Sequence, residues 1–241
     1  MKIKILYEDA NIVAIDKPSG VSVHSDGRSK EKTIADWVLE KYPKMKNVGE
    51  DEIYENKKIK IAIKKPGIVH RLDRETSGVM LLAKNQKTYE FLKKQFQDRE
   101  VKKTYVAIVS GSMKNDRGII SKPIGRSPTD FRRYSAGRGA RGEMREAVTQ
   151  YKVLKRFEIS HKKFSGLEIY PKTGRTHQIR VHLKYLNHPV VCDSLYNPDN
   201  PCPKDIKRLA LHAKSIEFKD LKGNILKIES PLPLEFKRVL K

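Results

Sequence analysis

Cysteine is scarce in this chain of 241 residues. The two cysteines, Cys192 and Cys202, are too few for a disulfide framework and too far apart for a C-x-x-C metal clip. A chain of this length also buries a sufficient core without covalent staples. We therefore expect two reduced thiols and no metal ion. A zinc site that adds His182, His188 or His212 is a minor alternative.

Signals for membranes, export and repeats are also missing. Met1–Glu8 shows neither a basic segment followed by an apolar run nor an Arg/Ser-rich amphipathic stretch. No later apolar run approaches the roughly 20 residues that a membrane helix needs. We expect a cytoplasmic protein with no membrane partner. Its length predicts one domain, residues 1–241.

Positive charge is abundant. Lysine and arginine number 51 against 29 acidic residues, which gives a formal net charge of +22. Such a field attracts polyanions, so nucleic acid leads the possible partners, although a lysine-rich solvated surface is the plainer interpretation. The densest basic segment spans about residues 122–146, with six arginines between Arg126 and Arg145 and little apolar content. It is predicted to be a mobile basic loop.

Local patterns predict more strands than helices. Thr33 is placed to cap a helix from Ile34, with Asp36 as its capping-box partner, and a second amphipathic helix is expected over Gln86–Gln97. The mixture indicates an α+β fold with a largely antiparallel mixed sheet flanked by helices and loops. Apolar, β-rich segments that predict strands are 12–15, 79–83, 105–109, 148–154, 167–170, 209–213 and 225–228.

The densest polar stretch runs from His70 to Gly78, just before the apolar segment 79–83. In it Asp73 lies near Arg71 and Arg74, and neighbouring cations favour an ionised carboxylate. An ionised carboxylate can act as a nucleophile or a base. Taken alone, this string also fits a surface loop with several ion pairs.

The same stretch reads H-R-L-D-x-x-T-S-G and resembles the signature of the RluA family of pseudouridine synthases. Four further stretches are similar to the family's motifs and follow its order along nearly the whole chain. They are the opening strand with its K-P-x-G turn at 7–20, K-x-Y-x-A at 103–107, G-R-T-H-Q-I-R-x-H at 174–182 and L-x-L-H-A at 209–213.

The resemblance implies the pseudouridine synthase fold and an RNA uridine isomerase that needs no cofactor. It assigns catalysis to Asp73, which attacks the ribose or removes a ribose proton to give a glycal. It further implies that Arg180 pairs with Asp73, and that Tyr105 stacks on the uracil and takes part in proton removal. Without the resemblance, Arg180 would be a solvent-facing helix arginine and Tyr105 a core residue.

The resemblance also implies a substrate-binding set. A uridine in a stem must flip out of its stack to react, and Arg71 is expected to fill the space that it leaves. His177 and His182 either orient their neighbours or contact phosphate. The residues expected to bind the substrate are Arg71, His70, Leu211 and Arg175.

Two features depart from the family pattern. Residues 191–197 stand where the family usually has G-D-x-x-Y-G, and they keep Asp193 and Tyr196 but replace both glycines. Many relatives begin with a small RNA-binding domain, whereas here the catalytic pattern starts near Met1. We therefore expect the catalytic domain itself to bind a stem-loop of ribosomal or transfer RNA. The sequence gives no signal of oligomeric state, and we expect a monomer.

Two other functional classes compete with this hypothesis. A glycosidase or base-excising glycosylase would use Asp73 and Glu75 as paired carboxylates. In a loop the two could flank one bond, but on an extended strand they would lie too close together on one face to leave room for a sugar. A catalytically silent RNA-binding or ribosome-assembly factor would keep the fold and charge alone. The presence of Asp73, Tyr105 and Arg180 together favours the enzyme.

Overall fold

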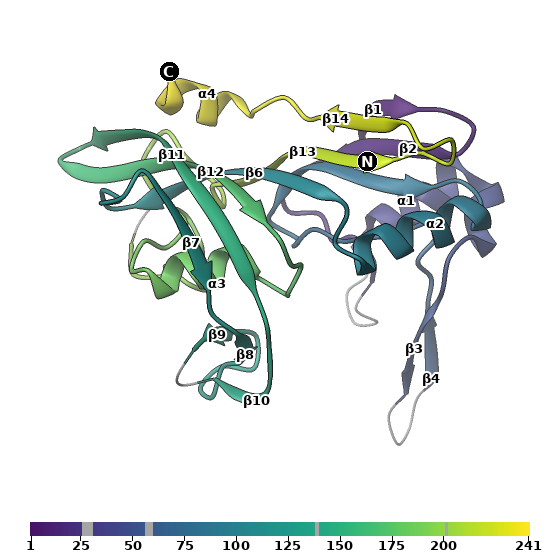
Figure 1. Ribbon diagram of the computed structural model, residues 1–241, viewed down its shortest axis with the longest axis horizontal. Coiled ribbons are helices and arrows are strands. Elements are labelled where there is room, and N and C mark those ends of the chain that lie inside the picture. The colour runs from purple at the N-terminus through teal and green to yellow at the C-terminus, as the bar shows by residue number, and fades with distance from the viewer. Residues whose placement is uncertain (26–30, 56–59, 138–139, 201) are drawn as a thin grey trace. The chain divides into compact units, whose positions relative to one another are not determined.

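The chain forms two compact units, which are described separately. The first comprises Met1–Val101 and Ser215–Ser230, and the second Lys102–Lys214 and Pro231–Lys241. The single domain expected from chain length stays a prediction. The computed structural model describes residues 1–25, 31–55, 60–137, 140–200 and 202–241 (Figure 1).

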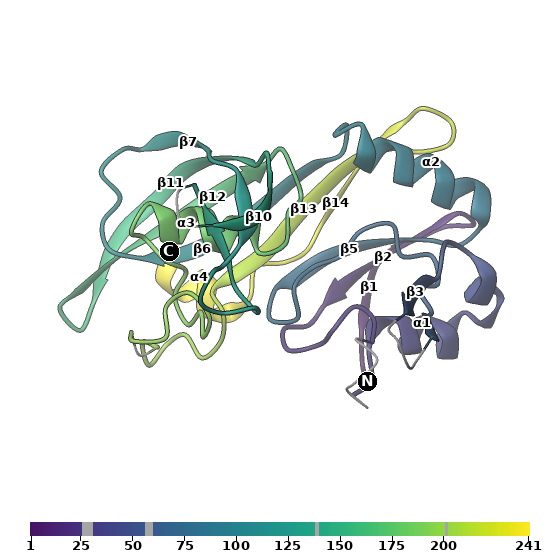
Figure 2. The ribbon, with the colours of Figure 1, turned by 90° about the horizontal axis from the view of Figure 1, so that it is seen from below.

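In the first unit three antiparallel strands lie side by side in the order β1-β2-β5 (Figure 2). Two antiparallel hairpins, β3–β4 and the end of β13 with β14, complete its strands. Its elements are β1 Lys4–Glu8, β2 Ile12–Lys17, α1 Ile34–Lys41, a 3-10 helix Pro43–Asn47, β3 Glu52–Glu55, β4 Lys60–Ile63, β5 Ser77–Ala83, α2 Gln86–Gln97, the end of β13 Leu211–Lys219, and β14 Ile225–Glu229.

Both predicted helices are present, and each begins at a side-chain cap. The hydroxyl of Thr33 accepts from the backbone N–H of Asp36, whose carboxylate accepts from the Thr33 N–H at 2.8 Å, so the capping box is complete. Asn85 caps α2 by accepting from the N–H of Thr88 at 3.0 Å. Because these caps satisfy otherwise unpaired N–H groups, local sequence alone determines where the two helices start.

The centre of the first unit is the pair β2 and β5. Ile12, Val13, Ala14 and Ile15 are buried, and so are all seven residues of β5. A strand buried at every position has both faces covered, which explains why β5 reads as an unbroken apolar run. The strand that follows the H-R-L-D motif is therefore part of a rigid core.

The second unit is built on four antiparallel strands in the order β6-β12-β11-β7. Its core includes the buried side chains of Val106, Ile108, Leu167, Leu183 and Phe236. Figure 2 shows β11 and β12 as long neighbouring strands. The elements of this framework are β6 Lys102–Ser110, β7 Arg117–Ser121, β11 Val148–Ile159, β12 Lys162–Pro171, α3 Gln178–Tyr185, the start of β13, and α4 Leu234–Leu240.

The segment expected to be a basic loop at 122–146 instead contains three short strands. Strands β8 (Ile124–Arg126), β9 (Tyr134–Ala136) and β10 (Arg141–Arg145) form an antiparallel sheet in the order β10-β8-β9. The prediction of a loop was wrong here because all of β10 is exposed, so its sequence has no apolar alternation to signal a strand. We call residues 124–145 the arm; its base packs in one apolar cluster with Val181 of α3 and with Tyr196.

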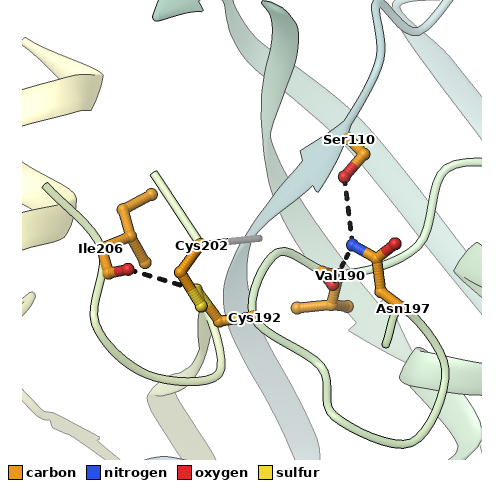
Figure 3. Close-up of a disulfide and its surroundings, with 6 residues drawn as sticks. All are labelled: Ser110, Val190, Cys192, Asn197, Cys202 and Ile206. Carbon is orange, nitrogen blue, oxygen red and sulfur yellow. Dashed lines mark hydrogen bonds between the residues drawn. A yellow bond between two sulfur atoms is a disulfide. The ribbon is translucent and has the colours of Figure 1, made fainter. Parts of the chain in front are cut away.

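The expectation of two reduced thiols is also wrong, because Cys192 and Cys202 form a disulfide (Figure 3). Their Cα atoms lie 5.1 Å apart, well within bridging range. Cys192 adopts a left-handed backbone conformation with φ 57°, and the chain folds back between the two residues. Spacing along the sequence could not show this approach. The sulfur of Cys192 also lies 3.2 Å from the carbonyl oxygen of Ile206.

The predicted fold class is confirmed: the protein is α+β, with mostly antiparallel strands flanked by helices. Within the described residues, no helix is long and apolar enough to cross a membrane.

Candidate functional site

Asp73 lies on an irregular segment between β4 and β5, and the start of this segment is fixed by backbone packing. The N–H of Gly67 donates to the carbonyl of Val48 at 2.8 Å, and the N–H of Ala83 donates to the carbonyl of Gly67 at 2.9 Å. At Gly67 φ is 64°, and an added Cβ would lie 2.2 Å from the Ala83 oxygen. Only glycine fits there, so the approach to the loop is rigid.

His70 fixes the next part of the loop. Its Nε2 accepts a hydrogen bond of 2.9 Å from the backbone N–H of Leu81 in β5. Its ring also stacks on Phe96 of α2, with centroids 4.7 Å apart. The structure therefore gives His70 an anchoring contact with strand and helix, whereas its expected contact with substrate stays a prediction.

The far end of the loop is held by a fully buried lysine. The ammonium of Lys17, at the end of β2, donates to the backbone carbonyls of Pro18, Val21 and Arg74 at 2.7–2.9 Å. The N–H of Gly20 donates to the same Arg74 carbonyl at 2.9 Å. The K-P-x-G turn and the H-R-L-D loop, more than fifty residues apart in sequence, are thereby joined next to Asp73.

The four side chains from Arg71 to Arg74 differ in their exposure to solvent. Leu72 is buried, Asp73 is half-buried, and Arg71 and Arg74 are exposed. The guanidinium of Arg74 donates to the carbonyl of Gly20 at 3.0 Å and forms an exposed ion pair. Arg71 is therefore accessible to a ligand, and the catalytic role of Asp73 stays a prediction.

In the second unit Arg180 of α3 is buried, so the alternative of a solvent-facing helix arginine is wrong. Its Nε and Nη2 donate to the two carboxylate oxygens of Asp193 at 2.7 and 2.8 Å. The ring of Tyr196 lies 5.1 Å from the guanidinium carbon. Asp193 and Tyr196 received no role from the sequence, because a contact between a helix residue and a segment 13 positions later has no periodic signal.

Gln178 organises the turn that precedes α3, and sequence analysis missed it. Its side-chain oxygen accepts from the N–H of Arg175 at 3.0 Å and from the hydroxyl of Thr173. Its amide nitrogen donates to the carbonyl of Val148 and the hydroxyl of Thr149. Both ends of the amide are used, so the G-R-T-H turn is fixed to β11.

His182 is fully buried and bonded at both ring nitrogens. Nδ1 lies 2.8 Å from the hydroxyl of Thr149, and Nε2 lies 2.9 Å from the carbonyl of Lys122. A carbonyl only accepts, so Nε2 carries the proton. Burial lowers the pKa of His182 below its usual value of 6.5. Of the two roles considered for it, His182 therefore orients its neighbours and does not contact phosphate.

The remaining predicted residues are divided between the units. Tyr105 is half-buried on β6, Leu211 is buried at the start of β13, and Arg175 is half-buried with its Nε donating to the carbonyl of Glu146. Asp73 belongs to the first unit, whereas Tyr105 and Arg180 belong to the second. Each unit thus presents part of the predicted site, and the pairing of Asp73 with Arg180 stays a prediction.

Among the described residues, no group of three or more histidine, cysteine, aspartate or glutamate side chains is placed to hold a metal ion. The zinc alternative with Cys192 therefore has no support in this part of the chain, and the sulfur of Cys192 is bonded to Cys202.

Comparison with known proteins places the chain in one family. The family model described as RNA pseudouridylate synthase matches residues 11–185. Ribosomal large subunit pseudouridine synthase D of Borreliella burgdorferi is 37% identical over 235 residues, which cover 97% of this chain and 66% of that protein. An uncharacterized RNA pseudouridine synthase of Aquifex aeolicus is 38% identical over 208 residues, 86% of this chain and 60% of that protein.

The chain thus spans less than two thirds of the length of these two relatives. Among solved structures, human RNA Pseudouridylate Synthase Domain Containing 4 superposes with a TM-score of 0.71 at 27% identity, covering 98% of this chain and 92% of that one. The match to the family model covers both the H-R-L-D loop and the helix that carries Arg180. The chain belongs to the RNA pseudouridylate synthase family.

Proposed function

We propose that this chain isomerises uridine to pseudouridine within RNA, with Asp73 as the catalytic carboxylate. The observation that carries the proposal is the loop of the family motif, in which a half-buried Asp73 sits between the anchor at His70 and the buried clamp at Lys17. A carboxylate that must meet one ribose carbon gains most of its effect from such fixed placement.

The reaction breaks one bond and makes another at the same carbon. The N1–C1′ bond of uridine breaks, the uracil turns within the site, and C5 bonds to C1′. C5 then loses its proton and N1 gains one, so the product is an isomer of the substrate. Asp73 serves either as the nucleophile at C1′ or as the base that removes a ribose proton to give a glycal. Neither route requires a metal ion or an organic cofactor.

The other predicted residues receive distinct roles in this proposal. Arg180 orients the Asp73 carboxylate, and Tyr105 stacks on the uracil with its hydroxyl toward the C5 edge. Arg71, which is exposed beside Asp73, fills the space left by the flipped uridine. Arg175 and Leu211 line the nucleotide site together with His70.

The substrate to test first is large-subunit ribosomal RNA, because the relative from Borreliella burgdorferi is named a ribosomal large subunit pseudouridine synthase. Transfer RNA is the second choice. A formal net charge of +22 suits either polyanion. We propose that the chain acts in the cytoplasm as a monomer, and that its catalytic domain itself binds the RNA.

The test is release of tritium from RNA transcribed with C5-tritiated uridine. The wild type is expected to release tritium, because pseudouridine formation replaces the C5 hydrogen. Asp73→Asn keeps the shape but not the charge, and should reduce release by at least about 10²–10⁴-fold. Mapping the modified position would then identify the uridine.

Two controls separate chemistry from binding and folding. Asp116→Asn, an exposed carboxylate of the second unit, should leave release unchanged. RNA affinity of the Asp73→Asn protein should equal that of the wild type. Tight RNA binding without release from any RNA would support the silent RNA-binding factor, and free uracil among the products would support a glycosylase.

A further inference from the structure

The carboxylate of Asp193 is fully buried and accepts four hydrogen bonds. Two come from the Arg180 guanidinium, and the others from the backbone N–H groups of Leu195 and Tyr196, both at 3.0 Å. The side chains of Arg180 and Asp193 are 5% and 0% exposed. All four donors belong to the second unit, and three of them converge on Oδ1 while the Arg180 Nε–H bonds Oδ2.

Such a pair is not explained by stability alone. Burying two charges costs much of what their attraction returns, and a buried ion pair is often no more stable than apolar side chains of similar volume. What a bidentate pair does provide is direction, because the guanidinium is planar and two parallel bonds fix its plane. Asp193 uses Nε and Nη2, so the orientation of Nη1 is fixed as well.

Tyr196 supports the same guanidinium from its ring face. Its centroid lies 5.1 Å from the Arg180 guanidinium carbon, in the range of a cation–π contact. Its hydroxyl lies 2.9 Å from Nδ1 of His177 and accepts from the backbone N–H of Tyr134 at 2.9 Å. The hydroxyl end of the ring is therefore fixed by two contacts, and Arg180 lies between a carboxylate along one edge and an aromatic face.

We propose that Asp193 is a positioning residue, which holds the Arg180 guanidinium in the orientation that the reacting carboxylate needs. This inference rests on the proposed function. Asp193 acts through Arg180 and does not itself touch the uridine. The family-typical aspartate is kept here although the glycines around it are replaced, and Cys192 supplies the left-handed backbone conformation just before it.

The first experiment compares Asp193→Asn, Asp193→Glu and the matched control Asp199→Asn, an exposed carboxylate of the same segment. Single-turnover tritium release at saturating enzyme is expected to fall about 10²-fold in both Asp193 variants, since a displacement of about 1 Å in a catalytic group has that effect. Their RNA dissociation constants should stay at the wild-type value, and Asp199→Asn should resemble wild type. Asp193→Glu keeps the negative charge and displaces it by one methylene. If the Asn variant does not fold, release by the Glu variant tests the inference.

A double-mutant cycle separates positioning from general structure. If Asp193 acts through Arg180, adding Asp193→Asn to Arg180→Lys should slow release by less than about threefold, because coupled residues are not additive. A full second loss in the double variant, or wild-type release by folded Asp193→Asn and Asp193→Glu proteins, would overturn the inference.

A spectroscopic readout tests the inference without activity. The side-chain Nε–H signal of Arg180, assigned by its loss in Arg180→Lys, should exchange slowly with water in the wild type. Asp193→Asn should accelerate that exchange and Asp199→Asn should not. An unchanged Arg180 signal in the Asp193→Asn protein would contradict the inference. Absence of tritium release from the wild type would instead contradict the proposed function, and the exchange measurement would still decide the role of Asp193.

Discussion

At the scale of single residues, Lys17 is a charged side chain that is fully buried. Lysine is almost never fully buried without partners, yet the Lys17 ammonium meets three backbone carbonyls and no solvent. Those carbonyls come from its own turn and from Arg74, the residue after Asp73. The charge therefore satisfies the acceptors of two segments at once and holds them together.

Replacing Lys17 by methionine should damage both stability and catalysis. Lys17→Met leaves the Pro18 and Val21 carbonyls without this donor, which should lower the free energy of unfolding by about 1–3 kcal/mol. The Asp73 loop would also lose a fixed point, so single-turnover tritium release should fall at least about tenfold. Urea unfolding and the release assay measure the two effects. Lys87→Met, at an exposed position of α2, is the matched control and should change neither.

His182 predicts a dependence of stability on pH. Burial lowers its pKa in the folded protein, so below the ordinary value of 6.5 the unfolded chain takes up a proton that the folded chain resists. The contribution of His182 to the free energy of unfolding is therefore complete above pH 6.5 and is lost as pH falls toward the folded pKa. Each pH unit in that window removes at most about 1.4 kcal/mol.

The measurement is the urea midpoint of wild type and His182→Gln at pH 7.5 and pH 5. Glutamine keeps a donor and an acceptor but does not titrate, so the stability advantage of the wild type should shrink at pH 5. His161→Gln, at a fully exposed side chain, is the matched control. A pH-independent difference for His182→Gln would show that the imidazole is not kept neutral by the fold.

At the scale of elements, local signals were sufficient where a cap or a continuous apolar pattern was present. The start of α1 and the buried strand β5 follow directly from Thr33 and the run of apolar residues after Gly78. The apolar pattern predicted α2, but its cap, Asn85, was identified only in the structure. The arm strands gave no such signal, because β10 is wholly exposed. Some contacts form only because the chain turns back on itself, such as the Arg180–Asp193 pair and the disulfide. They leave no periodic pattern in the sequence, and only the structure shows them.

The arm presents features that suit contact with RNA. Phe131 is 79% exposed, and the guanidinium of Arg126 stacks 4.8 Å from the centroid of the Tyr134 ring. Arg132 bonds Asp130 and holds its pKa at about 2, so that carboxylate stays charged at any working pH. The Arg132–Asp130 ion pair lies at the surface, where such pairs contribute little free energy, so Arg132 can exchange this partner for a phosphate.

Neutralising the arm should weaken RNA binding without slowing the chemical step. The triple change Arg132→Gln, Arg141→Gln and Arg145→Gln removes exposed charges but leaves the apolar base of the arm intact. If all three contact phosphates, the slope of log Kd against log salt concentration should fall by roughly 2–3. Single-turnover release at saturating enzyme should stay within about twofold of the wild type, because no arm arginine is assigned to the reacting atoms.

A matched control removes the same charge from another surface. Lys237→Gln, Arg238→Gln and Lys241→Gln neutralise exposed positions in and just after α4. This triple variant should retain the wild-type salt slope. Equal losses in both triple variants would mean that net charge, and not the arm, determines the affinity for RNA.

At the scale of the whole molecule, the formal charge of +22 and the buried Arg180–Asp193 pair respond differently to salt. Salt at about 0.15 M screens exposed charges beyond roughly 8 Å, whereas buried pairs are screened much less. The long-range field speeds encounter with RNA, but it plays no part once the uridine is seated. Added salt should therefore slow association with RNA and leave the rate of the chemical step unchanged.

Between 50 and 300 mM salt, the association rate with ribosomal RNA should fall by at least about tenfold, as for other steered encounters. The single-turnover rate of tritium release at saturating enzyme should change by less than about twofold, because the groups that orient the carboxylate are shielded from solvent. Stopped-flow binding and rapid-quench release on the same RNA give both rates. If release at saturation slowed in parallel with association, the chemical step would depend on exposed charge, and the buried pair could not be what fixes the reacting geometry.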